Sequence, residues 1–129
     1  MKVIWVNGCF DVLHRGHIEM LKYAKSLGDI LIVGIDADWR VKETKGSERP
    51  FNKEEDRKFM LESIKFVDKV IIFETDSELR GMIHHFKPEV MVVGSDWEGK
   101  SVVGSEYSKD VYYFSRVGDY STTKILEGM

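Results

Sequence analysis

Short apolar runs alternate with amphipathic segments along the chain, and this alternation is the strongest constraint on the fold. The runs are rich in β-branched residues and short enough to be buried strands. They are 2–6, 30–35, 68–73, 90–93 and 111–114. Strands that alternate with helices pair in parallel through crossover connections. The pattern therefore predicts an α/β fold, a doubly wound sheet of about five parallel strands flanked by helices.

The first and third connecting segments have clear helical patterns. Ile18, Leu21, Ala24 and Leu27 recur at helical spacing before Gly28. Segment 76–86 is amphipathic and is followed by a proline two residues later. Asn7-Gly8, after the first strand, is a turn signal. A short helix is also expected near the end of the chain, over 121–128.

The connection between the second and third strands has two parts. The polar stretch 36–50 has no clear period, and we predict a functional loop there. Asn52 is expected to cap a following helix, with Glu55 at the capping-box position. The apolar stripe of that helix is predicted to be Phe59, Met60, Ile64 and Phe66.

Composition limits the class of protein. The 129 residues fit one domain, 1–129, and the net charge of −3 argues against nucleic acid as a partner. Apolar runs are too short to cross a membrane, so no membrane association is expected. The single cysteine, Cys9, excludes an internal disulfide, and no secretory signal opens the sequence, which favours the cytoplasm.

Four polar segments follow predicted strands, at the sheet edge where doubly wound folds bind ligands. They are 7–17, 36–50, 94–100 and 116–123. His14 and His17 are spaced to lie on one face of a starting helix, with Gly16 between them. Two imidazoles at a helix N-terminus can donate hydrogen bonds to phosphate and stabilise growing negative charge.

The two histidines are also compatible with a structural role or with metal binding. They can be surface residues that make structural hydrogen bonds. They can also belong to a metal site with Cys9 and Asp11, although that spacing matches no known zinc motif.

The segment Gly8-x-Phe10-Asp11-x-x-His14-x-Gly16-His17 resembles the H-x-G-H signature of the nucleotidyltransferase superfamily. Ser121-Thr122-Thr123-Lys124-Ile125 is similar to a second signature, found in glycerol-3-phosphate cytidylyltransferases and their relatives. The resemblance covers nearly the whole chain in matching order, and it implies a Rossmann-like domain.

The resemblance also implies a reaction. The acceptor's phosphate oxygen attacks the α-phosphorus of a nucleoside triphosphate, and pyrophosphate leaves. The nucleophile is already an anion, so positioning and charge neutralisation supply most of the catalysis. Mg²⁺ is expected on the substrate phosphates, without a protein metal site.

Roles follow from the matched motifs, as implications of the resemblance. The catalytic group is His14, His17, Lys45 and Arg116. Nucleotide binding is expected from Gly8, Cys9, Phe10, Gly16, Gly94, Asp96, Trp97, Ser121, Thr122 and Thr123. Acceptor binding is expected from Asp11, Asp36, Asp38 and Arg57.

Two branches of the superfamily compete for the substrates. Asp96-Trp97-Glu98-Gly99-Lys100 and Arg116 resemble the CTP-dependent branch. Segment 7–11, the pattern Lys45-Gly46-x-x-Arg49-Pro50-x-Asn52 and segment 103–105 resemble the ADP-heptose branch, which uses ATP and a heptose 1-phosphate. The arginine and the tryptophan favour CTP, with a phosphorylated small molecule such as glycerol 3-phosphate or a related compound as acceptor.

Two further expectations concern the oligomeric state and an alternative type of function. The resembling enzymes are commonly dimers, so a homodimer is expected. A nucleotide-binding module without catalysis, or a metal-dependent regulator, is the alternative from another class.

Overall fold

The computed structural model describes residues 1–115. All five of its strands pair in parallel, in the order β3-β2-β1-β4-β5. The predicted Rossmann-like, doubly wound sheet is therefore confirmed. Along the chain, the strands and α-helices are β1 (Val3–Gly8), α1 (Arg15–Ser26), β2 (Ile30–Asp36), α2 (Asp38–Lys45), α3 (Glu54–Glu62), β3 (Lys69–Phe73), α4 (Asp76–Phe86), β4 (Val90–Gly94) and β5 (Asp110–Phe114).

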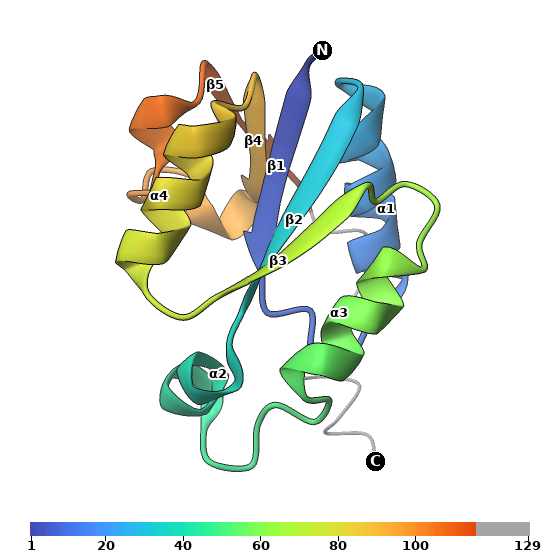
Figure 1. Ribbon diagram of the computed structural model, residues 1–129, viewed down its shortest axis with the longest axis vertical. Coiled ribbons are helices and arrows are strands. Elements are labelled where there is room, and N and C mark those ends of the chain that lie inside the picture. Colours follow the sequence, from blue (N-terminus) through green and yellow to red (C-terminus); the bar gives the residue numbers. More distant parts are fainter. Residues whose placement is uncertain (116–129) are drawn as a thin grey trace.

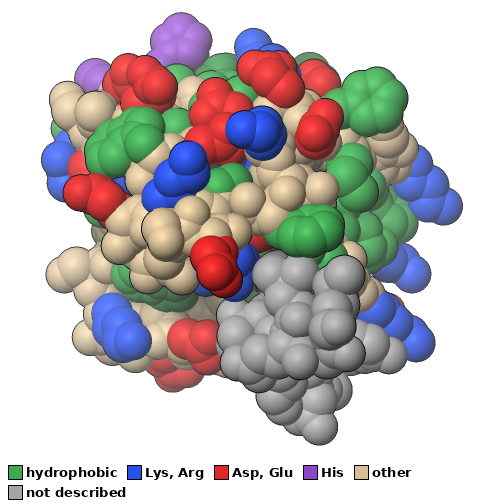
Figure 2. All heavy atoms as spheres, turned by 90° about the horizontal axis from the view of Figure 1, so that it is seen from below, with side chains coloured by type: hydrophobic (Ala, Val, Ile, Leu, Met, Phe, Trp, Pro, Cys, Tyr) green, Lys and Arg blue, Asp and Glu red, His purple; other side chains and the backbone are tan. Residues whose placement is uncertain are grey.

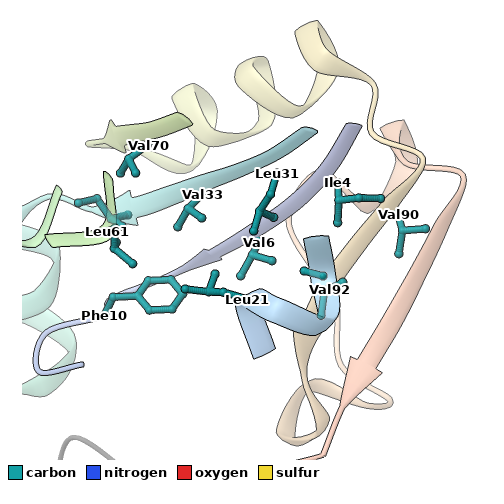
Figure 3. Packing of buried hydrophobic residues seen from close by; sticks show 12 residues of the cluster. Ile4, Val6, Phe10, Leu21, Leu31, Val33, Leu61, Val70, Val90 and Val92 are labelled. Atoms are coloured by element: carbon teal, nitrogen blue, oxygen red, sulfur yellow. The ribbon is translucent and has the colours of Figure 1, made fainter. Parts of the chain in front are cut away.

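Alternate residues of β1 face opposite sides of the sheet, as the period of a strand requires. Ile4 and Val6 belong to the cluster that includes Leu21 of α1 and Leu61 of α3 (Figure 3). Trp5 belongs to a second cluster, which includes Leu79 and Ile83 of α4. Helices α1 and α3 thus cover one face of the sheet and α4 covers the other (Figure 1).

Strand order places the candidate site. The connection from β3 to β4 crosses β1 and β2, so β1 has β2 on one side and β4 on the other. Ligands of open parallel sheets bind at such a switch point, beyond the carboxyl ends of the strands. These ends point toward α2 in Figure 1. Figure 2 views the molecule from this end, where acidic and basic side chains intermingle.

The first strand is longer than predicted. Asn7 and Gly8 were expected to form a turn, but they continue β1 and pair with Gly34 and Ile35 of β2. The Asn7 side chain also accepts a hydrogen bond from the Trp5 indole, at 3.0 Å. Pairing with a neighbouring strand has overridden the local turn preference.

The predicted loop 36–50 is wrong over residues 38–45, which form α2. Only Val41 of this helix is buried, so it has no apolar stripe for a sequence pattern to reveal. Its N-terminus is held instead by a tertiary contact. The Asp38 backbone N–H donates to Glu54 Oε1 at 2.9 Å, and the Glu54 backbone N–H donates to Asp38 Oδ1 at 2.8 Å.

The third helix also differs from expectation. Lys53 is the N-cap of α3 and makes no side-chain cap. The Asn52 amide donates to the Asp11 carbonyl instead. Phe59 and Met60 are 70% and 41% exposed, so these two positions of the predicted stripe are wrong, whereas Ile64, beyond the end of α3, packs against the core. The buried residues of α3 are Arg57 and Leu61. Arg57 can be buried because its guanidinium hydrogen-bonds inside the protein.

Within residues 1–115, none of the helices combines the length and the apolar character needed to cross a membrane.

Candidate functional site

The two histidines lie together at the start of α1. His14 is the N-cap, with extended backbone, and His17 is in the first turn. Their rings stack with centroids 3.8 Å apart and planes 22° apart. The Gly16 N–H donates to His14 Nδ1 at 3.0 Å, and the His14 N–H donates to His17 Nδ1 at 3.3 Å. The predicted pairing is present, although His14 precedes the helix.

These two bonds select one tautomer of each ring. A neutral imidazole that accepts at Nδ1 carries its proton on Nε2. Burial, and then the nearby charges of His14 and Lys45, lower the pKa of His17 from 6.5 to about 3. His17 is therefore a neutral imidazole at physiological pH, with Nε2 as a hydrogen-bond donor.

Phe10 packs against His17 of this pair. Its ring is buried and its centroid lies 5.1 Å from that of the His17 ring. Its φ of 50° is left-handed, which is unusual for a bulky residue. A Cβ on Gly8 would lie 3.2 Å from the Phe10 ring, so Gly8 leaves room for it. The predicted nucleotide contacts of Gly8 and Phe10 stay predictions, beside this observed packing role.

The Asp11 carboxylate is enclosed by partners within the protein. Asp11 is 2% exposed, and its oxygens accept from Arg49 Nε and the Phe51 N–H at 2.8 Å and from the Asn52 N–H at 2.7 Å. Burial raises the pKa of this carboxyl, but the hydrogen bonds from Asn52, Phe51 and Arg49 outweigh that effect and lower it. Asp11 therefore fastens the loop before α3 to the end of β1.

Arg57 has a similar internal role. It is 1% exposed, although it was expected to bind the acceptor. It donates to the carbonyls of Asn52, Cys9 and Asp36, and to Asp38 Oδ1 at 2.8 Å. One buried guanidinium thus joins the ends of β1 and β2 to the starts of α2 and α3.

The remaining acceptor candidate also has an internal partner. Asp36 accepts from Arg40 Nε at 3.0 Å, and Arg40 also pairs with Asp76. The charged atoms of Asp11, Asp38 and Arg57 hold segments of the protein together, and their expected contacts with the acceptor stay predictions. A sequence shows which residues are charged, but it does not show which other groups will lie next to them in the folded protein.

The other predicted residues lie around the same end of the sheet. Lys45 is the exposed last residue of α2, close enough to lower the pKa of His17. Gly94 ends β4 where an added Cβ would meet open space, and Trp97, just beyond it, is 50% exposed. Asp96 lies between them. Arg116, Ser121, Thr122, Thr123 and the predicted helix 121–128 fall outside the described residues.

Cys9 is half-buried, and burial raises the pKa of its thiol. Over residues 1–115, no three acidic, histidine or cysteine side chains gather closely enough to hold a metal ion. Asp11, one member of the alternative metal site, is already hydrogen-bonded through both carboxylate oxygens within the protein.

Sequence reasoning missed Arg49. Its side chain is 14% exposed and pairs with Asp11. A signal was present, because an aspartate in a segment that becomes buried needs a cationic or N–H partner. Arg49 was part of a pattern that resembles the ADP-heptose branch, but the sequence did not show which of the 19 Lys and Arg residues would pair with Asp11.

A family model described as cytidylyltransferase-like matches residues 5–127. The chain belongs to the cytidylyltransferase-like family. The match extends from β1 through the segment that contains the Ser-Thr-Thr signature, which confirms the resemblance found in the sequence.

Curated relatives of this family member include proteins named bifunctional protein HldE. The Helicobacter pylori (strain ATCC 700392 / 26695) protein is 45% identical over 126 residues, 98% of this chain and 27% of the relative. The Nitratiruptor protein is 46% identical over 128 residues, 99% and 28% of the two chains. The chain thus spans about a quarter of the length of these relatives.

Solved structures show the same fold. A lipopolysaccharide core biosynthesis protein from Thermoplasma volcanium superposes with a TM-score of 0.69 and 25% identity, covering 94% of this chain and 99% of that one. Pantoate-beta-alanine ligase from Francisella tularensis gives a TM-score of 0.59 at 16% identity, over 98% and 68% of the two chains. The second likeness concerns the fold alone.

The comparisons correct the predicted choice of nucleotide. The HldE relatives belong to the ADP-heptose branch, so the prediction that CTP is the donor is wrong. Trp97 and Arg116 are weak indicators of the base, because a tryptophan or an arginine can serve packing or charge neutralisation whichever nucleotide is bound.

Proposed function

We propose that this nucleotidyltransferase transfers AMP from ATP to a sugar 1-phosphate of the heptose 1-phosphate class and releases pyrophosphate. The proposal rests on the HldE relatives and on one structural observation. The two segments that resemble the ADP-heptose branch, 7–11 and 45–52, are joined by the Asp11 carboxylate and by the Asn52 amide. Residues of that motif therefore form one unit beside the histidine pair.

In the proposed mechanism, Nε2 of His14 and of His17 donate hydrogen bonds to the α-phosphate. Charge on its oxygens grows as the acceptor oxygen attacks, and preformed donors stabilise that charge without reorganising. A neutral His17 fits this role, because its Nδ1 is occupied and its Nε2 carries the proton. Lys45 neutralises charge on the outer phosphates, and Arg116, Ser121, Thr122 and Thr123 are proposed to do the same.

Mg²⁺ is proposed to enter with ATP, held by the phosphates, and to neutralise part of their charge. The residues of the described chain fit that arrangement, because the Asp11 carboxylate near the histidine pair is engaged with Arg49 and with backbone N–H groups. Nucleoside contacts are proposed for Gly94, Asp96 and Trp97.

A donor and acceptor matrix tests the proposal. Pyrophosphate release is measured with ATP or CTP against heptose 1-phosphate or glycerol 3-phosphate. We expect ATP with heptose 1-phosphate to exceed every other pair by at least about 100-fold in kcat/KM, the discrimination that polar recognition of a substrate can provide. Turnover with CTP and glycerol 3-phosphate alone would contradict the proposal, and binding of ATP without any turnover would favour a non-catalytic module.

A homodimer is also proposed, because the enzymes that this chain resembles are commonly dimers. Light scattering coupled to size exclusion measures the mass in solution, and a mass of one chain would contradict the proposal.

A further inference from the structure

Arg49 has one buried nitrogen without a hydrogen bond. Its Nε donates to Asp11 Oδ2 at 2.8 Å, and its backbone N–H donates to the Gly46 carbonyl at 3.1 Å. Nη2 is buried, and within residues 1–115 it is the only buried side-chain nitrogen or oxygen that lacks a partner. A buried unsatisfied donor is costly and usually has a functional reason.

The geometry of the Asp11 pair is also informative. An arginine whose purpose is to neutralise a carboxylate commonly uses two nitrogens side by side. Asp11 instead receives one bond from Arg49, and its other bonds come from the Phe51 and Asn52 backbone. Asp11 therefore orients the guanidinium through Nε and leaves Nη2 for another acceptor.

Position in the sheet indicates which substrate that acceptor belongs to. Arg49 lies between α2 and α3, in the connection that follows β2. Segment 94–97 follows β4, on the other side of β1. With the nucleoside over β4 and the histidine pair after β1, the second substrate approaches over β2. Arg57, the buried arginine on that side, already donates to four protein oxygens.

We propose that Arg49 binds the phosphate of the acceptor and makes the enzyme specific for a phosphate monoester. This inference rests on the proposed function. Nη2 donates to a non-attacking oxygen of the monoester, and Asp11 positions the guanidinium. Another oxygen of the same phosphate then bonds to the α-phosphorus of ATP, as the α–β bridging bond breaks and pyrophosphate leaves with that electron pair.

Two substitutions test it. Arg49→Gln removes the charge and Nη2, and Arg49→Lys keeps a charge beside Asp11 but loses the planar fork. We expect Arg49→Gln to raise KM for heptose 1-phosphate about 10- to 100-fold, the loss typical of one charge-assisted hydrogen bond, with KM for ATP within about twofold. Arg49→Lys is expected to lie between it and wild type. Arg80→Gln, exposed on α4 and paired with Glu106, is the matched control and should change neither KM.

Three results would overturn the inference. They are an unchanged KM for heptose 1-phosphate in Arg49→Gln, an equal rise in KM for both substrates, and a fully active Arg49→Lys enzyme. If Arg49→Gln does not fold, as circular dichroism would show, Arg49→Lys decides the matter by the same comparison of the two KM values.

A binding measurement separates this inference from the proposed function. If wild type does not turn over ATP and heptose 1-phosphate, the proposed function fails. Mannose 1-phosphate, a sugar phosphate monoester, is then titrated into the wild-type protein and both variants by calorimetry. Binding that weakens at least about 10-fold in Arg49→Gln supports the role of Arg49. Equal binding, or none to wild type, contradicts it.

Discussion

At the scale of single residues, His14 and His17 hold each other in one orientation. Each Nδ1 is occupied by a backbone N–H at the start of α1, and the rings stack at 3.8 Å. Such preorganisation is what a group that stabilises a transition state requires, because it need not reorient during the reaction. The same contacts make His17 both a proposed catalytic group and part of the helix cap.

Replacing His17 tests the catalytic part of that role. We expect His17→Ala to lower kcat for AMP transfer about 100- to 1,000-fold, the effect of removing one preorganised donor. KM for ATP should change much less. His85→Ala, an exposed histidine on α4, is the control and should keep wild-type activity. Survival of more than about a tenth of the wild-type kcat in His17→Ala would exclude the mechanism.

The depressed pKa of His17 predicts how stability depends on pH. The unfolded chain binds a proton on this residue below about 6.5, whereas the folded protein resists it down to about 3. Stability conferred by the neutral ring is therefore present above 6.5 and is lost as the pH falls toward 3. Between about pH 7 and pH 5 we expect wild type to lose about 1 to 2 kcal/mol more than His17→Ala.

Urea unfolding at the two pH values measures this difference. The window above about pH 4 separates His17 from Asp11, whose pKa is lowered from 3.8 and which acts only at lower pH. If wild type and His17→Ala lose the same free energy of unfolding between the two pH values, the predicted lowering of the His17 pKa in the folded state is wrong.

At the scale of elements, α2 and α3 begin against each other. Asp38 and Glu54 each accept the other's backbone N–H, so each helix supplies the N-terminal acceptor of its neighbour. Asp38 Oδ1 also receives a bond from buried Arg57. This contact keeps α2, with Lys45 at its end, beside the histidine pair.

We expect the two sides of this contact between α2 and α3 to contribute unequally to the free energy of unfolding. Asp38→Ala should destabilise the protein by about 2 to 4 kcal/mol, because it removes a cap and leaves Arg57 without its carboxylate. Glu54→Ala removes one cap and should cost about 1 kcal/mol. Glu55→Ala, exposed on the same turn, should cost less than about 0.5 kcal/mol. Urea unfolding gives all three values, and equal costs for Asp38→Ala and Glu54→Ala would show that the Arg57 bond contributes little.

At the scale of the whole molecule, the sheet depends on close approach between neighbouring strands. A Cβ on Gly34 of β2 would lie 2.7 Å from the Trp5 ring, which is fully buried under α4. A Cβ on Gly81 of α4 would meet nothing within 4 Å. The two glycines therefore have opposite requirements, although both lie inside regular elements.

The same substitution at these two sites tests the packing. Gly34→Ala should destabilise the protein by about 1 to 3 kcal/mol, the usual cost of overpacking a core. Gly81→Ala should stabilise it by about 0.5 to 1 kcal/mol, because alanine favours a helix and restricts the unfolded chain. Thermal and urea unfolding measure both. Destabilisation by Gly81→Ala would contradict the prediction, because it would mean that the added methyl group at position 81 does not project into open space.

Much of the molecule followed from the sequence. Short apolar runs predicted the five strands, and the helical spacing of apolar residues predicted α1 and α4; their alternation predicted the parallel sheet. Motif resemblance predicted the family and the paired histidines. Helix α2 and the true buried face of α3 escaped, since α2 buries little and α3 buries an arginine.

Only the tertiary structure decided what the charged residues do. Asp11, Asp38 and Arg57 were expected to face a substrate, but each has its nearest partner in a segment distant in the sequence. Arg49, which had no expected role, is the one held with a spare buried donor. Helices and strands can be predicted because their patterns depend on residues that are close in the sequence. Ion pairs depend instead on distances that exist only after the chain has folded.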